Sequence, residues 1–192
     1  LKIEGMKKLS IILGLLFIFT ISGFAQITRK GGDVRPPVTI NWMSLEEAMQ
    51  KSAAAPKKII VDVYTSWCKW CDKMEETTFR DPVIAQYINE NFYAVKFDAE
   101  LQQEINYKDK SYGNSKNGKR GYHDLIKELT GGRFSFPTLI FLDENQNLIQ
   151  CVVGFKTPSQ FEQISSYFAD NHYRKIPWSS FQEMYRQLDI KE

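Results

Sequence analysis

The sequence predicts an α/β domain in which helices flank a central mixed β-sheet, and three observations support this fold class. Residues 59–64 form a nearly continuous β-branched run that passes directly into a helical pattern, and residues 92–98 predict a second strand. A strand, a helix and a second strand in this order are typical of a parallel pair. Farther along, residues 138–142 and 148–153 flank a polar turn, which predicts an antiparallel hairpin.

The N-terminal residues predict a secretory signal. Lys7 and Lys8 precede an apolar run at 9–21, and small residues then lead to Ala25. This order is typical of a signal peptide, and the run is shorter than the ~20 residues of a membrane-spanning helix. We expect cleavage after Ala25, export to the periplasm or the extracellular space, and no stable membrane anchor afterwards. The first cysteine is Cys68, so a lipid anchor at the cleavage point is not expected.

After the signal segment (1–25), residues 26–43 contain glycine and proline without apolar periodicity, which predicts a tether and the entry to the domain. The folded domain is expected over 44–172 and a C-terminal helical extension over 173–192. Of the 25 basic and 23 acidic residues, Lys2, Lys7, Lys8 and Glu4 lie in the leader, so 22 of each sign remain. A near-neutral mature chain gives no support to a nucleic-acid footprint or a polybasic membrane patch.

Helix starts are marked by residues whose side chains accept hydrogen bonds from the first free backbone N–H groups. The first such helix ends before Pro56, and the last carries an apolar stripe that predicts packing on the domain or on a partner. The pairs that mark these starts are Ser44 with Glu47, Asp81 with Pro82, Thr157 with Gln160, and Ser179 with Gln182.

The segment 107–121 is polar, with five basic residues, three glycines and no period, and it predicts an exposed loop. A short helix over 122–129 follows and is expected to end at Gly131 and Gly132.

Two cysteines lie where the first buried strand passes into a helix, in the order Cys68-Lys69-Trp70-Cys71. The helix start places free N–H groups and the positive end of the helix dipole at the Cys68 sulfur. In such a position the pKa of a thiol can fall from about 8.5 to roughly 3.5–7.5, and the thiolate is the species that attacks disulfides. Cys68 is therefore the candidate nucleophile, and Cys71, one turn later, is the candidate resolving thiol.

Asp62 and Lys96 are the only charged residues inside the two predicted parallel strands. A buried carboxylate without a partner is costly, so we expect these side chains to face each other. A carboxyl group beneath the resolving cysteine could accept its proton, which is general-base chemistry. In the alternative, Lys96 extends to solvent from an edge strand.

The segment 61–71, Val-Asp-Val-Tyr-Thr-Ser-Trp-Cys-Lys-Trp-Cys, resembles the active-site segment of the thioredoxin superfamily. Residues 73–82 extend the similarity to the branch that includes the C-terminal periplasmic domain of thiol:disulfide interchange reductases. Phe136-Pro137-Thr138 resembles the family's cis-proline turn, and Val153-Gly154 its last-strand glycine. The resemblance spans about residues 44–171.

This resemblance implies a thioredoxin-like sandwich with Pro137 in cis beside the cysteines. It implies a thiol:disulfide oxidoreductase that acts on cysteine-containing exported proteins, with an unidentified redox partner protein and no cofactor besides the Cys68–Cys71 disulfide. We expect a reductant, although reduction, oxidation and isomerisation use the same two thiols and the direction stays open at this point. Lys69-Trp70 replaces the Gly-Pro of typical thioredoxins. The residues expected to contact substrate are Trp67, Lys69, Trp70, Phe136, Pro137 and Thr138.

Other interpretations of the cysteine pair remain open at this point. Structural zinc usually takes four ligands, and only Cys151, His123 and His172 remain; two thiolates could instead hold Cu(I). A metal-handling or substrate-holding thioredoxin-like protein without turnover is the main alternative, and a permanent structural disulfide is another. Cys151 is expected to be an inert core residue.

Single residues near the cysteines have simpler interpretations too. Trp70, Met74 and Phe79 fit a helical core face, and Trp67 could pack inside or cover the site. We expect the two histidines to be ordinary surface or helix residues.

Overall fold

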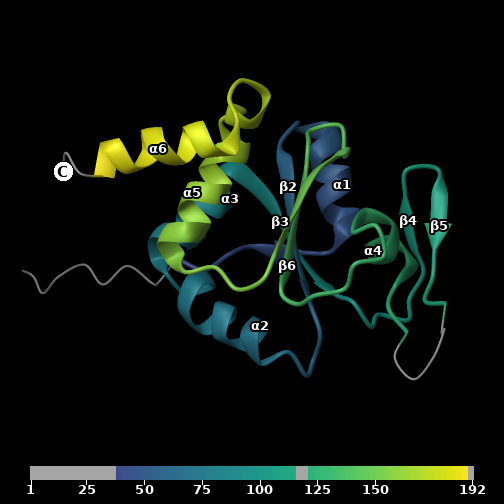
Figure 1. Ribbon diagram of the computed structural model, residues 1–192. Helices are drawn as coiled ribbons and strands as arrows, with labels where there is room; N and C mark the ends of the chain where they lie inside the picture. Colours follow the sequence, from purple (N-terminus) through teal and green to yellow (C-terminus); the bar gives the residue numbers. More distant parts are fainter. Residues whose placement is uncertain (1–37, 116–120, 190–192) are drawn as a thin grey trace, which may run out of the picture. The chain divides into compact units, whose positions relative to one another are not determined.

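The computed structural model describes residues 38–115 and 121–189 (Figure 1). The expected signal segment, most of the expected tether and residues 116–120 of the expected loop lie outside these ranges. Within them, no helix combines the length and the apolar composition that crossing a lipid bilayer requires.

A five-stranded mixed sheet forms the centre of the domain, which confirms the predicted fold class. The strand order is β1-β3-β2-β6-β7. β3 pairs in parallel with both β1 and β2, whereas β6 pairs antiparallel with both β2 and β7. The strands are β1 (Trp42–Met43), β2 (Lys58–Tyr64), β3 (Phe92–Asp98), β6 (Thr138–Leu142) and β7 (Leu148–Val153).

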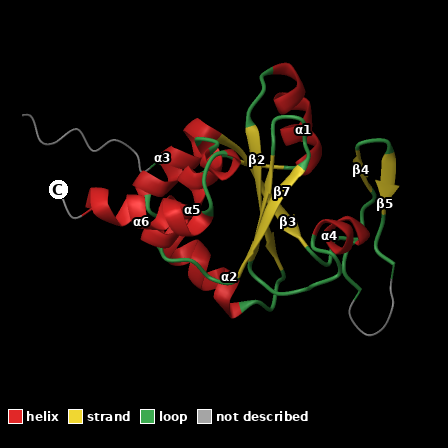
Figure 2. Cartoon of the chain, turned by 45° about the horizontal axis from the view of Figure 1, so that its top comes forward, coloured by secondary structure: helices red, strands yellow, loops and turns green. Residues whose placement is uncertain are grey.

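Helices cover both faces of this sheet (Figures 1 and 2). The helices α3 (Pro82–Asn91) and α5 (Pro158–Ala169) share one apolar cluster with Ile60 of β2, whereas α1 (Leu45–Ala54) and α4 (Asp124–Leu129) share another with Ile59. Adjacent residues of a strand point to opposite faces, so a strand covered on both sides needs apolar residues throughout. This explains the β-branched run of β2.

Capping residues start these helices where the sequence predicts. Ser44 accepts a hydrogen bond from the N–H of Glu47, and Asp81 accepts from the N–H groups of Val83 and Ile84. Thr157 and Gln160 form a reciprocal capping box at α5. These signals are reliable because they act within one turn of chain.

The helix after the cysteine motif buries a different face from the predicted one. It consists of α2 (Lys69–Met74) and a single π-helical turn, η1 (Glu75–Phe79). Met74 and Phe79 are buried, as predicted, but Trp70 is 61% exposed, so its expected core position is wrong. Cys71 faces the interior, and the neighbouring residue of a helix lies about 100° around the axis.

The segment predicted as a loop at 107–121 contains a short hairpin instead. β4 (Ile105–Tyr107) pairs antiparallel with β5 (Lys110–Tyr112), and Lys108 adopts a positive φ of 54° in the turn. Tyr107 and Tyr112 are both buried. The prediction missed this hairpin because only Ile105, Tyr107 and Tyr112 in it are apolar, and their burial depends on the cluster around α4.

His123 is fully buried at the start of α4, so of the two expected positions, surface or helix, it takes the helical one. Its Nδ1 accepts the N–H of Leu125 at the start of α4, and its Nε2 lies 3.1 Å from the Gln103 carbonyl oxygen. His123 therefore caps a helix, and burial is possible because both ring nitrogens have partners.

The C-terminal helix forms as predicted but starts earlier. A 3₁₀ turn, η2 (His172–Arg174), precedes α6 (Trp178–Asp189), so Ser179 lies inside the helix and is not its cap. Phe181 is 2% exposed, and its ring centre lies 5.0 Å from that of Tyr167 in α5. The helix thus packs on the domain.

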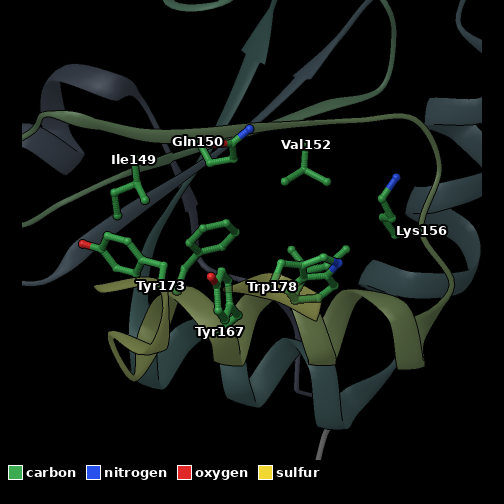
Figure 3. Close-up of a pocket in the computed structure, with 9 residues that line it drawn as sticks. Ile149, Gln150, Val152, Lys156, Tyr167, Tyr173 and Trp178 are labelled. Atoms are coloured by element: carbon green, nitrogen blue, oxygen red, sulfur yellow. The ribbon is translucent and has the colours of Figure 1, made fainter. Parts of the chain in front are cut away.

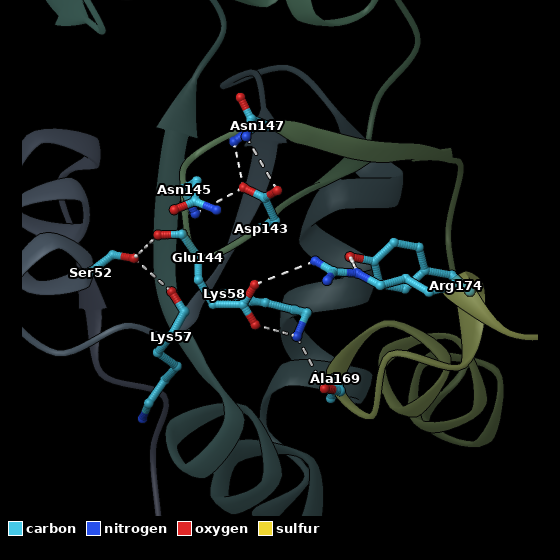
Figure 4. A network of polar contacts seen from close by, with 10 residues as sticks. Ser52, Lys57, Lys58, Asp143, Glu144, Asn145, Asn147, Ala169 and Arg174 are labelled. Carbon is cyan, nitrogen blue, oxygen red and sulfur yellow. Dashed lines mark hydrogen bonds and ion pairs between the residues drawn. The ribbon is translucent and has the colours of Figure 1, made fainter.

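An ion pair joins the start of β2 to the turn between β6 and β7, and Arg174 of the C-terminal segment lies beside it (Figure 4). The Lys58 Nζ lies 2.6 Å from Glu144 Oε1 and donates to the Ala169 carbonyl oxygen at 3.2 Å. Arg174 approaches the other Glu144 oxygen at 3.8 Å. Because the Lys58 side chain is only 5% exposed, loss of the Glu144 carboxylate would leave a poorly solvated charge on Lys58.

Candidate active site

Cys68 and Cys71 form a disulfide at the start of α2. Strand β2 ends at Tyr64, and the Cys68 N–H donates to the Thr65 carbonyl oxygen at 3.1 Å, which closes a tight turn. Cys68 occupies the N-cap position, where its Sγ accepts the backbone N–H of Cys71 at 3.1 Å. The strand-to-helix junction therefore holds both sulfurs together, as the spacing predicts, and directs a backbone donor at the Cys68 sulfur.

Two tryptophans lie next to the cysteines in the chain, and the cysteines themselves are only 6% and 8% exposed. Trp67 is 44% exposed, donates its indole N–H to Glu100 at 3.1 Å, and lies edge-on to Phe136 with ring centres 5.9 Å apart. On the other side, the Trp70 ring centre is 5.6 Å from that of Phe155. Lys69 is exposed between the two tryptophans.

The Phe136–Pro137 peptide bond is cis, and it precedes β6. Thr138 is the register partner of Val63 near the end of β2, so the proline turn lies beside the strand that leads to the cysteines. Gly154, with a φ of 86°, donates its N–H to the Pro137 carbonyl oxygen at 2.8 Å. The ring contact between Phe136 and Trp67 joins the turn to the cysteine motif.

Asp62 and Lys96 are direct neighbours in the β2–β3 register, and Lys96 Nζ lies 3.3 Å from Asp62 Oδ2. Lys96 also pairs with Glu75, the first residue of η1. The prediction missed Glu75. The sequence feature that could have identified Glu75 is its position four residues after Cys71, which places both residues on the same face of a helix.

Burial raises the pKa of Asp62 from 3.8 to about 6, even though Lys96 acts in the opposite direction. Burial also opposes the charge on Lys96, but its two carboxylate partners outweigh burial and raise the pKa of its ammonium group. Asp62 Oδ1 is buried and has no hydrogen-bond partner among the described residues. Asp62 is thus a carboxyl group that changes protonation near neutral pH, with one acceptor oxygen still available.

Three aromatic rings enclose the Lys96 ammonium group. Its Nζ lies 5.0 Å from the ring centre of Trp42, 5.4 Å from Tyr64 and 5.5 Å from Phe79. Trp42 belongs to β1, which the sequence did not predict, and its ring meets that of Phe79 edge-on at 5.1 Å. Cation–π contacts of this kind hold the ammonium group between its two carboxylate partners.

Replacing Trp42 by leucine is expected to raise the pKa of Asp62 further above about 6. The substitution removes a cation–π contact of about 0.5–1 kcal/mol, so Lys96 stabilises the Asp62 carboxylate less well. The carboxyl carbon chemical shift of Asp62, followed by NMR across pH, reports the change. Tyr93→Leu is the matched control, because that ring lies against Lys57 at 5.1 Å. Equal effects of the two substitutions on Asp62 would contradict the role of Trp42.

No group of three or more histidine, cysteine, aspartate or glutamate side chains suited to a metal ion occurs in the described parts of the chain. Cys151 lies on β7, where its thiol donates to the Leu129 carbonyl oxygen at 3.4 Å and burial raises its pKa. Burial therefore keeps Cys151 in the thiol form, which is the unreactive one.

The family model for a thioredoxin-like domain matches residues 45–169. An uncharacterized protein of Caenorhabditis elegans is 29% identical over 125 residues, which cover 62% of this chain and 16% of that protein. The thiol:disulfide interchange protein DsbD of Haemophilus ducreyi is 29% identical over 121 residues, which cover 62% of this chain and 18% of DsbD. The chain thus spans less than a fifth of the length of these curated relatives.

Solved structures support the same fold. A thioredoxin-fold protein from Helicobacter pylori superposes with a TM-score of 0.55, at 14% sequence identity, over 79% of this chain and 94% of that one. The region matched by the family model contains the cysteine motif, Asp62, Lys96 and the proline turn, whereas Trp42 and α6 lie outside it.

Proposed function

The chain belongs to the thioredoxin-like domain family, and on this basis we propose that it is a thiol:disulfide oxidoreductase acting on cysteine-containing polypeptides. The observation that carries the proposal is the Cys68–Cys71 disulfide at the first turn of α2, with the Cys71 N–H directed at the Cys68 sulfur. A sulfur that accepts a backbone N–H at a helix start is stabilised as a thiolate once the disulfide is reduced.

In the proposed reaction, the Cys68 thiolate attacks one sulfur of a substrate disulfide, and the other substrate sulfur leaves as a thiolate. A mixed disulfide then joins Cys68 to the substrate. Cys71 loses its proton and attacks the Cys68 sulfur, which releases the second substrate thiolate. Two electrons have passed from the cysteine pair to the substrate, and a partner dithiol restores the pair in a second exchange.

Asp62 is proposed to accept the proton of Cys71 at the resolving step. Its raised pKa of about 6 makes it a stronger base than an ordinary carboxylate, and its free Oδ1 can receive the proton. Lys96 remains charged and stabilises the Asp62 carboxylate before it accepts the proton, with Glu75 and the aromatic rings holding the ammonium group in place.

The substrate backbone is proposed to lie along Phe136, Pro137 and Thr138. The exposed side chains of Trp67, Lys69 and Trp70 would contact residues on either side of the substrate cysteine. Aromatic rings suit this task, because they offer large contact areas with little loss of conformational entropy.

We propose that the protein works after export, in the periplasm or the extracellular space, as a reductant whose electrons come from a redox partner protein. The relationship to DsbD, named a thiol:disulfide interchange protein, supports this assignment. So does the expected signal segment of the sequence.

The reduced wild-type protein is expected to accelerate the reduction of insulin disulfides by dithiothreitol, and Cys68→Ser is expected to abolish the acceleration. Insulin precipitation, followed by turbidity, measures the rate. Unchanged acceleration by Cys68→Ser would contradict the proposed nucleophile. The equilibrium of the cysteine pair with glutathione then reports the direction of electron transfer, since a reductant must have a reduction potential below that of the glutathione pool.

A further inference from the structure

Strand β7 is one edge of the central sheet. Its sequence, Leu-Ile-Gln-Cys-Val-Val, contains no charge and no proline, although edge strands commonly carry such residues because they prevent pairing with other chains. Val153 is 51% exposed. A register irregularity beside Leu142 limits the regular ladder to residues 150–153. The sheet therefore ends in a short, uncharged strand that is suited to accept another strand.

Peptide orientation identifies the groups at the free edge. The Gly154 N–H points toward Pro137 at the start of β6, and in a trans peptide the preceding carbonyl points the opposite way. The Val153 carbonyl therefore faces the free edge, and so does that of Cys151, two residues earlier. Lys156 Nζ donates to the Val153 oxygen at 2.6 Å, and the Gln150 amide donates to the Cys151 oxygen at 3.2 Å. An added strand would donate to these two oxygens in place of the side chains, which would release the Lys156 ammonium group.

A groove of about 600 Å³ lies beside this edge, between β7 and the helices α5 and α6 (Figure 3). Val152 of the strand lies opposite Trp178 of α6, Ile149 lies opposite Tyr173, and Tyr167 of α5 lies between the two aromatic residues. A strand added to β7 would direct every second side chain onto the face of Val152, which is the face that borders the groove. The edge would bind the backbone of such a segment, and the groove would bind its apolar side chains.

One end of the groove adjoins the candidate active site. Lys156 lines the groove, and its neighbour Phe155 contacts the ring of Trp70 between the two cysteines. Lys156 makes its hydrogen bonds to backbone carbonyls, and no described carboxylate lies within 4.0 Å of its ammonium group. A ligand with an acidic group at this end would supply the missing negative charge.

We propose that the β7 edge and its groove bind an extended, apolar segment of the polypeptide substrate, with an acidic residue next to Lys156, while the substrate cysteine reacts at Cys68. This inference rests on the proposed function. It adds a second contact surface, and it assigns the substrates to the class of unfolded or extended chains with alternating apolar residues.

Backbone pairing can be tested on the wild-type protein with two peptides that have the same side chains. The first is a disulfide-linked peptide whose cysteine is joined to one aspartate and an alternating apolar stretch. The second carries N-methyl groups on alternate residues, so that its backbone cannot donate to an edge strand. We expect N-methylation to raise KM for reduction at least tenfold and to leave kcat within twofold. Equal KM values would overturn the proposal.

Substitutions test the groove in parallel. Val152→Lys and, separately, Trp178→Ala are expected to raise KM for the unmodified peptide at least tenfold, while kcat/KM for oxidised glutathione, which is too small to reach the groove, stays within twofold. Val83→Lys is the matched control, because Val83 is 65% exposed on α3 and does not line the groove. If Val152→Lys and Trp178→Ala give the same KM for the peptide as Val83→Lys, the proposal is overturned.

Failure of the proposed function gives a different result. If the wild-type protein reduces neither disulfide, binding of the peptide's serine analogue, measured by fluorescence polarisation, still tests the groove: binding that Val152→Lys weakens tenfold supports it, and absence of binding overturns it. A concentration-dependent dimer that Val152→Lys dissociates would show that a second copy occupies the edge, and would also overturn the proposal.

Discussion

Replacing Cys71 by serine is expected to convert turnover into covalent capture, with the substrate held on Cys68 and its release slowed at least about a thousandfold. The attacking sulfur is unaffected, because the donor to Cys68 is the backbone N–H of residue 71, which serine retains. What is lost is the second sulfur at the high effective concentration that the helix turn provides. Non-reducing gel electrophoresis and mass spectrometry measure the mixed disulfide and its lifetime.

Cys151 offers a matched control for this experiment. Its thiol is partly buried on β7 and bonded to the Leu129 carbonyl oxygen, so Cys151→Ser should leave turnover unchanged. The trap is best made in the Cys151→Ser background, where Cys68 is the only cysteine left to react. Capture that disappears in that background would assign the reaction to Cys151. Recovery of a metal ion without mixed disulfides would favour the metal-handling alternative.

Replacing Asp62 by asparagine is expected to raise the free energy of unfolding by about 1–3 kcal/mol at pH 8 while slowing the resolving step about 10- to 100-fold. The pKa of Asp62 rises from 3.8 in the unfolded chain to about 6 in the fold. The folded state therefore binds this proton more tightly. Below pH 3.8 the carboxyl group is neutral in both states. Between pH 3.8 and about 6 the unfolded chain releases this proton while the folded state keeps it, so the free energy of unfolding falls until the buried carboxyl group also ionises.

The stabilising effect of Asp62→Asn should consequently be small near pH 4, grow up to about pH 6 and stay constant above it. Chemical denaturation of the oxidised proteins at pH 4, 6 and 8 measures this profile. Asp109→Asn is the matched control, because Asp109 is exposed in the turn of the β4–β5 hairpin. A substitution at Asp62 that destabilises the protein equally at all three pH values would show that the Lys96 pair outweighs burial. Unchanged release of the mixed disulfide would remove Asp62 from the resolving step.

Local signals explain why much of the fold could be predicted. The residues of β3, the caps of α1, α3 and α5, and the β6–β7 hairpin each depend on patterns within a few residues of chain. The opposition of Asp62 and Lys96 was also predictable, since two charges in apolar parallel strands must compensate each other. The proximity of Cys68 and Cys71 was predictable too, because their spacing equals one helical turn.

Features that depend on distant segments were missed. Strand β1 has two residues and exists only through its pairing with β3. The β4–β5 hairpin and the burial of His123 depend on contacts with α4 and with the chain before it. Glu75 and Trp42 contact Lys96 from separate elements, and the periodicity of the sequence does not predict such contacts.

The sequence by itself determined the order of β2, β3, β6 and β7, the starts of α1, α3 and α5, and the pair of sulfurs at a strand-to-helix junction, because hydrogen bonding and side-chain alternation act over one or two turns of chain. The tertiary structure alone decided which side of α2 is buried, how burial shifts the proton affinity of Asp62, and that the C-terminal helix builds a groove beside β7. These depend on desolvation and on packing between residues far apart in the chain, and both arise only after the sheet has brought them together.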